Sequence, residues 1–136
     1  MRFDRVYLNT LVKSFIDRVS PRPSYIPKEL DIQSDVRGSQ NWQSWSGKVG
    51  IYVFVNDKDF LYVGRAMKNT YLGKRIDDGT KINKDVEQST WNKVINDPLT
   101  KIILYVFENE NDDYWVAALE LYLIDELQTL YNKRRG

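Results

Sequence analysis

The sequence predicts an α+β fold in which a small antiparallel sheet of three strands is flanked by helices. Residues 49–55 and 60–63 are rich in β-branched and aromatic side chains, and the polar turn 56–59 separates them, which is the pattern of a β-hairpin. A third stretch of this kind, residues 101–107, lies between helical patterns. Helices alternating with a few strands in this way favour a sheet covered by helices.

An N-terminal helix is predicted over residues 4–19, with Asp4 as its N-cap. Apolar side chains recur in this segment at helical spacing, at Leu8, Leu11, Val12, Phe15, Ile16 and Val19. Pro21 and Pro23 stop the helix. The segment that follows is expected to be irregular, with a short turn of helix near residues 28–33.

Two helices are predicted between the second and third strands. Residues 71–78 form a helix that ends at Gly79, and residues 86–96 form a helix that stops before Pro98. Residues 34–48, which precede the first strand, are polar, contain two glycines and two tryptophans, and are expected to form a loop.

A long helix is predicted after the third strand. Asp112 or Asp113 caps its start, and it is expected to continue to about Thr129. The chain therefore divides into residues 1–46, an N-terminal helical extension with an irregular arm, and residues 47–136, which contain the predicted sheet.

The composition excludes several kinds of catalytic chemistry. The 136 residues include no cysteine and no histidine. Zinc sites built from these residues, Ser-His-Asp triads and histidine acid–base catalysis are therefore excluded. A hydrolytic site must use carboxylates, tyrosine, lysine or arginine, with a hard metal ion bound through oxygen.

The sequence also bears on where the protein works. No apolar run approaches the roughly 18 residues that indicate a transmembrane helix. The N-terminus lacks the continuous apolar core of a secretory signal. Because there is no cysteine, nothing requires an oxidising compartment. We therefore expect a cytoplasmic protein that does not enter a membrane.

Charge is unevenly distributed along the chain, although the net charge is only +1. Residues 61–84 contain six basic and two acidic side chains, whereas residues 107–126 contain seven acidic side chains and no basic one. A basic surface beside an acidic element suits a protein that grips a phosphate backbone and places a metal ion next to it. Two ordinary solvated faces of opposite sign would give the same pattern, so charge alone leaves both alternatives open.

Short motifs in the second half of the chain occur in a recognisable order. Gly50-Ile51-Tyr52 lies on the first predicted strand and Tyr62-Val63-Gly64 on the second, with the two tyrosines ten positions apart. Arg75 follows on the next helix, Glu120 lies in the long helix, and Asn132 closes the series. Together these five elements resemble the GIY-YIG nuclease superfamily, over 83 of the 136 residues.

The resemblance implies a metal-dependent DNA endonuclease that hydrolyses phosphodiester bonds. In such an enzyme Tyr52 would deprotonate or orient the attacking water, and Tyr62 would line the same pocket. Arg75 would stabilise the charge on the scissile phosphate, and Glu120 would hold Mg²⁺ or Mn²⁺. Two features depart from the family pattern: no histidine follows the motif arginine, and Leu130 replaces a proline that is common before the final asparagine.

Glu120 is also a candidate because of its own surroundings. Its helical neighbours three and four positions away are all apolar: Val116, Ala117, Leu123 and Ile124. A carboxylate in such a stripe is costly unless it binds a metal ion or pairs with a nearby arginine. The residues alone leave these two alternatives open, and the resemblance favours the metal ion.

The remaining candidates have supporting roles. A free tyrosine has a pKa of about 10, so Tyr52 would need a metal-bound water or a neighbouring cation, for which Arg65 and Lys74 are the candidates. Gly50 and Gly64 are expected to mark a bulge or a close approach of backbone. The final candidate, the motif asparagine, is expected to hold the C-terminal segment against the sheet.

Several biological roles fit such an enzyme. A compact restriction-type nuclease acting as a dimer is the first interpretation, and a structure-selective repair or mobile-element nuclease is the alternative. A non-catalytic DNA-binding module that retains the fold is a rival from another class. The N-terminal extension would clamp DNA, form a homodimer through Leu8, Leu11 and Phe15, or simply cover the sheet.

Overall fold

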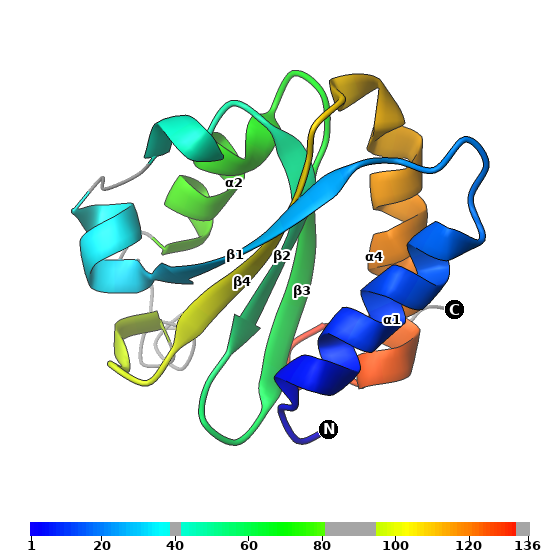
Figure 1. Ribbon diagram of the computed structural model, residues 1–136. Coiled ribbons are helices and arrows are strands. Elements are labelled where there is room, and N and C mark those ends of the chain that lie inside the picture. Colours follow the sequence, from blue (N-terminus) through cyan, green and yellow to red (C-terminus); the bar gives the residue numbers. More distant parts are fainter. Residues whose placement is uncertain (39–41, 81–94, 133–136) are drawn as a thin grey trace.

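Four antiparallel strands form the sheet. The computed structural model describes residues 1–38, 42–80 and 95–132, and Figure 1 shows how their helices and strands are arranged. In their order across the sheet, the strands are β1 (Tyr25–Asp31), β4 (Lys101–Phe107), β2 (Val49–Val55) and β3 (Phe60–Ala66). The two edges of the sheet are therefore β1 and β3.

β2 and β3 form the predicted hairpin. The side chain of Asn56 accepts hydrogen bonds from the backbone N–H groups of Lys58 and Asp59, at 2.8 and 2.7 Å, and so closes the turn. β3 continues three residues beyond the predicted end at Val63, to Ala66. The predicted third strand is also confirmed, as β4.

β1 is a strand that the sequence analysis does not predict, and the expected three-stranded sheet is wrong. Its residues pair with β4 along their whole length, from Tyr25 opposite Phe107 to Asp31 opposite Lys101. The segment expected to be irregular is therefore extended from Tyr25 to Asp31, and of the helical turn expected near residues 28–33 only the last two residues, at the start of a helix, are helical. Proline argues against a strand, but an edge strand tolerates it. The pairing partner lies far along the chain, so no local pattern indicates it.

The segment between β1 and β2 is more regular than the loop expected at residues 34–48. A short π-helix, η1 (Ile32–Arg37), begins after Asp31, whose side chain accepts hydrogen bonds from the N–H groups of Gln33 and Ser34. A 3₁₀ turn, η2 (Trp42–Ser44), follows. Trp45 is then completely buried, which anchors this segment on the sheet.

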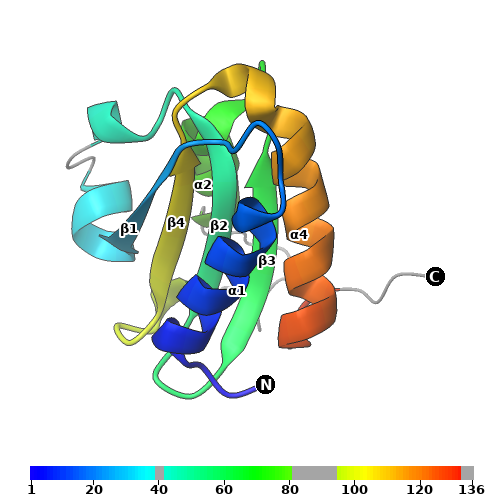
Figure 2. The ribbon, with the colours of Figure 1, turned by 45° about the vertical axis from the view of Figure 1, so that its right-hand side comes forward.

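Two helices cover one face of the sheet. α1 (Arg5–Asp17) and α4 (Asp113–Leu127) lie side by side on it (Figure 2). The rings of Phe15 and Tyr122 join the two helices, with their centroids 5.5 Å apart. Asp4 accepts a hydrogen bond from the first turn of α1, as predicted for its N-cap.

The apolar face of α1 packs into the core beneath it. Leu8 has no exposed surface and Leu11 is 8% exposed, and both belong to the core cluster that α1 and α4 share with the sheet. Of the three roles considered for the N-terminal extension, covering the sheet is the one that this packing fulfils. The same residues are not exposed for contact with a second copy of the chain.

α2 (Tyr71–Thr80) packs on the opposite face of the sheet, together with η1 and Trp45. The sequence predicts that this helix ends at Gly79, but it continues through that residue to Thr80. Thr80 is buried, and its hydroxyl donates to the carbonyl oxygen of Ile76 at 2.8 Å. This burial and hydrogen bond outweigh the tendency of glycine to stop a helix.

The rest of the predicted helices are placed as follows. The helix expected at residues 86–96 lies outside the described residues except for Ile95 and Asn96, which are helical. α4 follows a 3₁₀ turn, η4 (Glu110–Asp112), and ends at Leu127, slightly earlier than predicted. In the described parts of the chain, no helix combines the length and the apolar character needed to cross a membrane.

Candidate active site

The candidate residues come from four elements and meet at the edge of the sheet formed by β3. Tyr52 lies on β2, Tyr62 on β3, Arg75 on α2 and Glu120 on α4. α2, which carries Arg75, and α4, which carries Glu120, cover opposite faces of the sheet (Figure 1). Burial raises the pKa of both tyrosines and of Glu120, and the charge of Arg75 opposes this rise in all three, so the four side chains share one electrostatic environment.

Gly64 allows the ring of Tyr52 to lie across the edge strand. The two residues are directly opposite each other in the hairpin. A Cβ atom on Gly64 would be 2.2 Å from Cζ and 2.4 Å from the hydroxyl oxygen of Tyr52. Gly50 has a comparable constraint, because a Cβ there would be 2.2 Å from the carbonyl oxygen of Tyr105 on β4. Both glycines therefore sit at close approaches, and Gly64 directs the Tyr52 hydroxyl over β3.

Tyr52 and Tyr62 form the aromatic part of the site. Their ring centroids are 6.3 Å apart, and Tyr52 is only 7% exposed. Burial is the main cause that raises the pKa of Tyr52, the nearby Tyr62 and Glu120 raise it further, and Arg75 opposes them. Burial and Glu120 also raise the pKa of Tyr62. Both hydroxyl groups are therefore protonated at neutral pH.

Glu120 is paired with Arg65 across the edge of the sheet. The distance between Nη1 of Arg65 and Oε1 of Glu120 is 2.9 Å, and the glutamate side chain is 14% exposed. Burial raises the pKa of Glu120, whereas the charges of Arg65 and Arg75 lower it. The pairing with an arginine that the sequence left open is therefore present. It uses one of the two carboxylate oxygens.

The two basic residues of α2 that were singled out differ in their surroundings. Arg75 is exposed, and its charge acts on Tyr52. Lys74 lies 3.5 Å from Asp78, one helical turn further on, and its side chain is 68% exposed. The cation expected to assist Tyr52 was Lys74 or Arg65. In the structure Lys74 is paired with Asp78 and Arg65 with Glu120. The cation that opposes the rise in the pKa of Tyr52 is Arg75.

Asn132 holds the C-terminal segment along the outer edge of β3. Its side chain accepts a hydrogen bond from the N–H of Val63 at 2.7 Å and donates one to the carbonyl oxygen of the same residue at 2.9 Å. The N–H of Tyr131 donates to the carbonyl oxygen of Leu61 at 2.9 Å. The amide of Asn132 thus substitutes for a neighbouring strand, and this cover ends one residue before Gly64.

The residues at this edge are compatible with a divalent metal ion. Oε2 of Glu120 accepts no hydrogen bond from the residues that the structure describes. Mg²⁺ is commonly held by one or two carboxylates, with waters and substrate phosphate oxygens as its other ligands. Three or more acidic side chains do not gather into a closed metal cage anywhere in residues 1–38, 42–80 and 95–132. The donor set therefore fits an open site with a single carboxylate.

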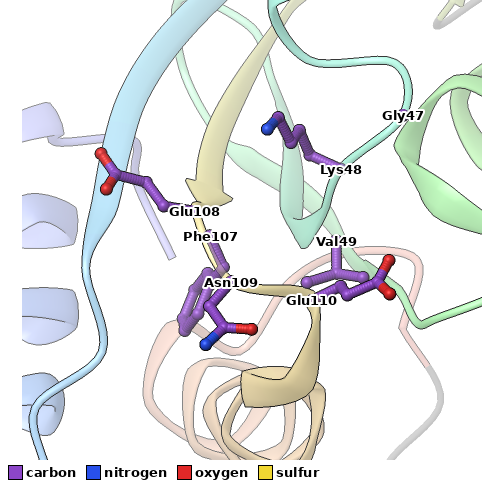
Figure 3. A pocket seen from close by; sticks show the side chains of 7 residues that line it. All are labelled: Gly47, Lys48, Val49, Phe107, Glu108, Asn109 and Glu110. Atoms are coloured by element: carbon purple, nitrogen blue, oxygen red, sulfur yellow. The ribbon is translucent and has the colours of Figure 1, made fainter.

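A separate cavity of about 330 Å³ lies at the ends of β2 and β4, beside η4 (Figure 3). Its lining residues are Gly47, Lys48, Val49, Phe107, Glu108, Asn109 and Glu110. None of the candidate catalytic residues lines it. Its charges are mixed, with one lysine and two glutamates.

Two residues at the starts of α2 and η4, Tyr71 and Glu110, are paired although no sequence pattern points to them. The hydroxyl of Tyr71 donates to Oε2 of Glu110 at 2.9 Å. The two residues are 39 positions apart, so their pairing is a product of the fold. Tyr71 also has a positive φ of 66°, and no sequence pattern predicts this backbone conformation.

No family model, no curated protein and no solved structure matches this chain. The case for a function therefore depends on the chemistry and geometry of the residues at the β3 edge.

Proposed function

We propose that this chain is a metal-dependent DNA endonuclease of the GIY-YIG type, which hydrolyses phosphodiester bonds. The observation that supports this proposal most is the meeting of Tyr52, Tyr62, Arg75 and Glu120 at one edge of the sheet. They are brought there by four different elements, and the charge of Arg75 acts on the other three. Packing alone does not require two tyrosines, an arginine and a glutamate to lie together at one edge of the sheet.

Arg75 is suited to bind and stabilise the scissile phosphate. Its guanidinium is charged at any relevant pH and presents several N–H donors to phosphate oxygens. It is exposed at the site, so a phosphate can reach it. As water attacks phosphorus and the bond to the leaving oxygen breaks, the extra negative charge on the phosphate oxygens would be stabilised by this guanidinium.

Tyr52 acts in this proposal as a neutral hydrogen-bonding group. Because its pKa is raised, it is not a phenolate at neutral pH. Its hydroxyl oxygen can accept a hydrogen bond from the attacking water and so orient it. Tyr62 packs 6.3 Å away, centroid to centroid, and keeps this hydroxyl in place.

Glu120 is the residue that would hold Mg²⁺ or Mn²⁺, through Oε2. Such an ion supplies Lewis acidity and lowers the pKa of a bound water. Arg65 binds the other carboxylate oxygen at 2.9 Å and so fixes the orientation of Glu120. Arg65 and Lys74 also add positive charge along the path of a phosphate backbone.

The proposal is tested by incubating supercoiled plasmid with the protein and Mg²⁺, with and without EDTA. The test variant is Glu120→Gln, and the control is Glu126→Gln, which makes the same change at an exposed position of the same helix. We expect metal-dependent nicking or linearisation by the wild type and the control, and a loss of at least about a hundredfold in Glu120→Gln. Discrete products would support a restriction-type enzyme over a structure-selective one.

The opposite result is equally clear. If the wild type and both variants leave several forms of DNA intact but bind them, the chain is a DNA-binding module without catalysis. If cleavage by Glu120→Gln equals that of the wild type, the nuclease activity does not belong to this site.

A further inference from the structure

The connection between β3 and α2 is strained. Asn69 has a φ of 78° and Tyr71 a φ of 66°. Positive φ is unfavourable for any residue with a Cβ atom, and a bulky side chain such as tyrosine is rarely found there. Strain of this kind persists only where surrounding contacts hold the backbone in place.

Three hydrogen bonds from this connection reach the 3₁₀ turn η4 and the first residue of α4. The backbone N–H of Lys68 donates to Oδ2 of Asp113 at 3.2 Å, and its Nζ donates to Oδ1 of Asn111 at 2.7 Å. The hydroxyl of Tyr71 donates to Oε2 of Glu110 at 2.9 Å. The end of β3 and the start of α4 lie next to each other in both views (Figures 1 and 2).

These bonds join the segment that leads into α2 to the 3₁₀ turn η4 and the first residue of α4, and α2 and α4 carry the charged site residues. α2 begins at Tyr71, and Arg75 is four positions later, about one helical turn further on. α4 begins at Asp113, and Glu120 is seven positions later, which is about two turns. The connection is therefore about one turn from Arg75 along α2 and about two turns from Glu120 along α4.

We propose that Tyr71 is a positioning residue, whose hydrogen bond to Glu110 sets the spacing between α2 and α4 and hence between Arg75 and Glu120. The functional consequence rests on the proposed nuclease activity, whereas the spacing itself does not. Glu110 is a carboxylate acceptor, and charge-assisted hydrogen bonds are stronger and shorter than neutral ones. Small displacements of reacting groups have large kinetic effects, because catalysis depends on close alignment.

The kinetic test is Tyr71→Phe, which removes the hydroxyl and keeps the ring. The hydrogen bonds of Lys68 remain in this variant, so the fold is expected to persist. We expect the rate of plasmid cleavage at saturating DNA to fall by about tenfold, with little change in DNA affinity. Glu110→Gln keeps an oxygen acceptor and should retain more activity than Glu110→Ala. Adding Glu110→Ala to Tyr71→Phe should cause little further loss.

The matched control is Tyr105→Phe, which removes a different tyrosine hydroxyl. That hydroxyl donates to Oδ1 of Asn9 at 2.6 Å, between β4 and α1, and has no contact with the connection. We expect this variant to lose stability but to keep the catalytic rate.

A second measurement is independent of nuclease activity. Since the chain has no cysteine, Asp78→Cys and Tyr114→Cys place spin labels uniquely at exposed positions of α2 and α4. We expect the label-to-label distance distribution from electron paramagnetic resonance to shift or broaden with Tyr71→Phe and to be unchanged with Tyr105→Phe.

The two measurements separate the two proposals. If Tyr71→Phe changes the label-to-label distance but the wild type cleaves no DNA, the role of Tyr71 is supported and the proposed nuclease activity is rejected. An unchanged distance overturns the role of Tyr71, whether or not the cleavage rate falls.

Discussion

At the scale of single residues, the site depends on one small side chain and one large one that face each other. Gly64 has no Cβ atom, and the space where that atom would be is filled by the ring of Tyr52. The ring can therefore cross the edge strand while Tyr52 remains 7% exposed. Burial in turn raises the pKa of Tyr52. The same packing thus determines both where the hydroxyl lies and why it stays protonated.

This relation predicts the effect of Gly64→Ala. The new methyl group would overlap the ring, so Tyr52 must move, and we expect the free energy of unfolding to fall by about 1–3 kcal/mol. DNA cleavage should fall by roughly a hundredfold because the hydroxyl is displaced. Gly47→Ala is the control, since a Cβ there has no atom within 4 Å. Urea unfolding and plasmid cleavage measure both effects, and wild-type cleavage by Gly64→Ala would show that the position of Tyr52 is unimportant.

At the scale of elements, one half of the edge strand β3 is covered by the C-terminal segment and the other half carries site residues. The first half is covered by the C-terminal segment, through Asn132 and the backbone of Tyr131. The second half carries Gly64 and Arg65, next to the candidate site. An exposed strand edge invites pairing with other chains. The cover therefore protects the part of the edge that lies before the candidate site residues.

Asn132→Ala tests this cover. The variant loses both hydrogen bonds to Val63, and we expect the free energy of unfolding to fall by about 1–2 kcal/mol. The amide proton of Val63 should exchange with solvent markedly faster, as measured by hydrogen exchange and NMR. Asn132→Asp can still accept from the N–H of Val63 but cannot donate to its carbonyl oxygen, so an intermediate effect is expected. Unchanged exchange in Asn132→Ala would mean that the segment is held by other contacts.

The elements also show where sequence patterns were sufficient. The two runs of β-formers and the polar turn between them predict the hairpin, and the capping residue Asp4 predicts the start of α1; both are confirmed. β1 is missed because its strand character comes from pairing with β4. The helix end predicted at Gly79 is wrong because the burial of Thr80 favours one more residue of helix.

At the scale of the whole molecule, the sheet separates two apolar layers, and each contains a buried tyrosine. Tyr105 belongs to the layer beneath α1 and α4, and Tyr52 to the layer beneath α2. Burial is the first cause that raises the pKa of each above the ordinary value of 10.0. The folded protein therefore keeps both phenol protons at a pH at which the unfolded chain releases them.

This difference predicts unfolding at alkaline pH. Below pH of about 10 both states are protonated at these tyrosines and folding is not penalised. Above it the unfolded state binds fewer protons than the folded state, so the free energy of unfolding falls as pH rises. We expect the part of the phenolate absorbance that comes from these buried tyrosines to rise together with the loss of the circular dichroism signal in one alkaline transition. Complete phenolate formation with an unchanged circular dichroism signal would contradict this prediction.

The candidate site was accessible to sequence analysis only in part. The order of the motifs nominates Tyr52, Arg75 and Glu120, because the spacing of short motifs is a property of the chain itself. The partners of these residues are a property of the fold. Arg65 and Glu120 are 55 positions apart, and the sequence cannot say that this arginine, among all the others, is the one that pairs with the glutamate.

The sequence by itself therefore determined the local elements and the chemistry available to the protein: the hairpin, the first helix, and a histidine-free and cysteine-free set of side chains. Helical and strand periodicity, capping and turns depend on residues a few positions apart, so they can be predicted locally. The tertiary structure alone decided the fourth strand, the cover of β3 by Asn132, and the pairings of Arg65 and Tyr71. These contacts form only when distant segments are brought together, and packing of the whole chain selects them among many local alternatives.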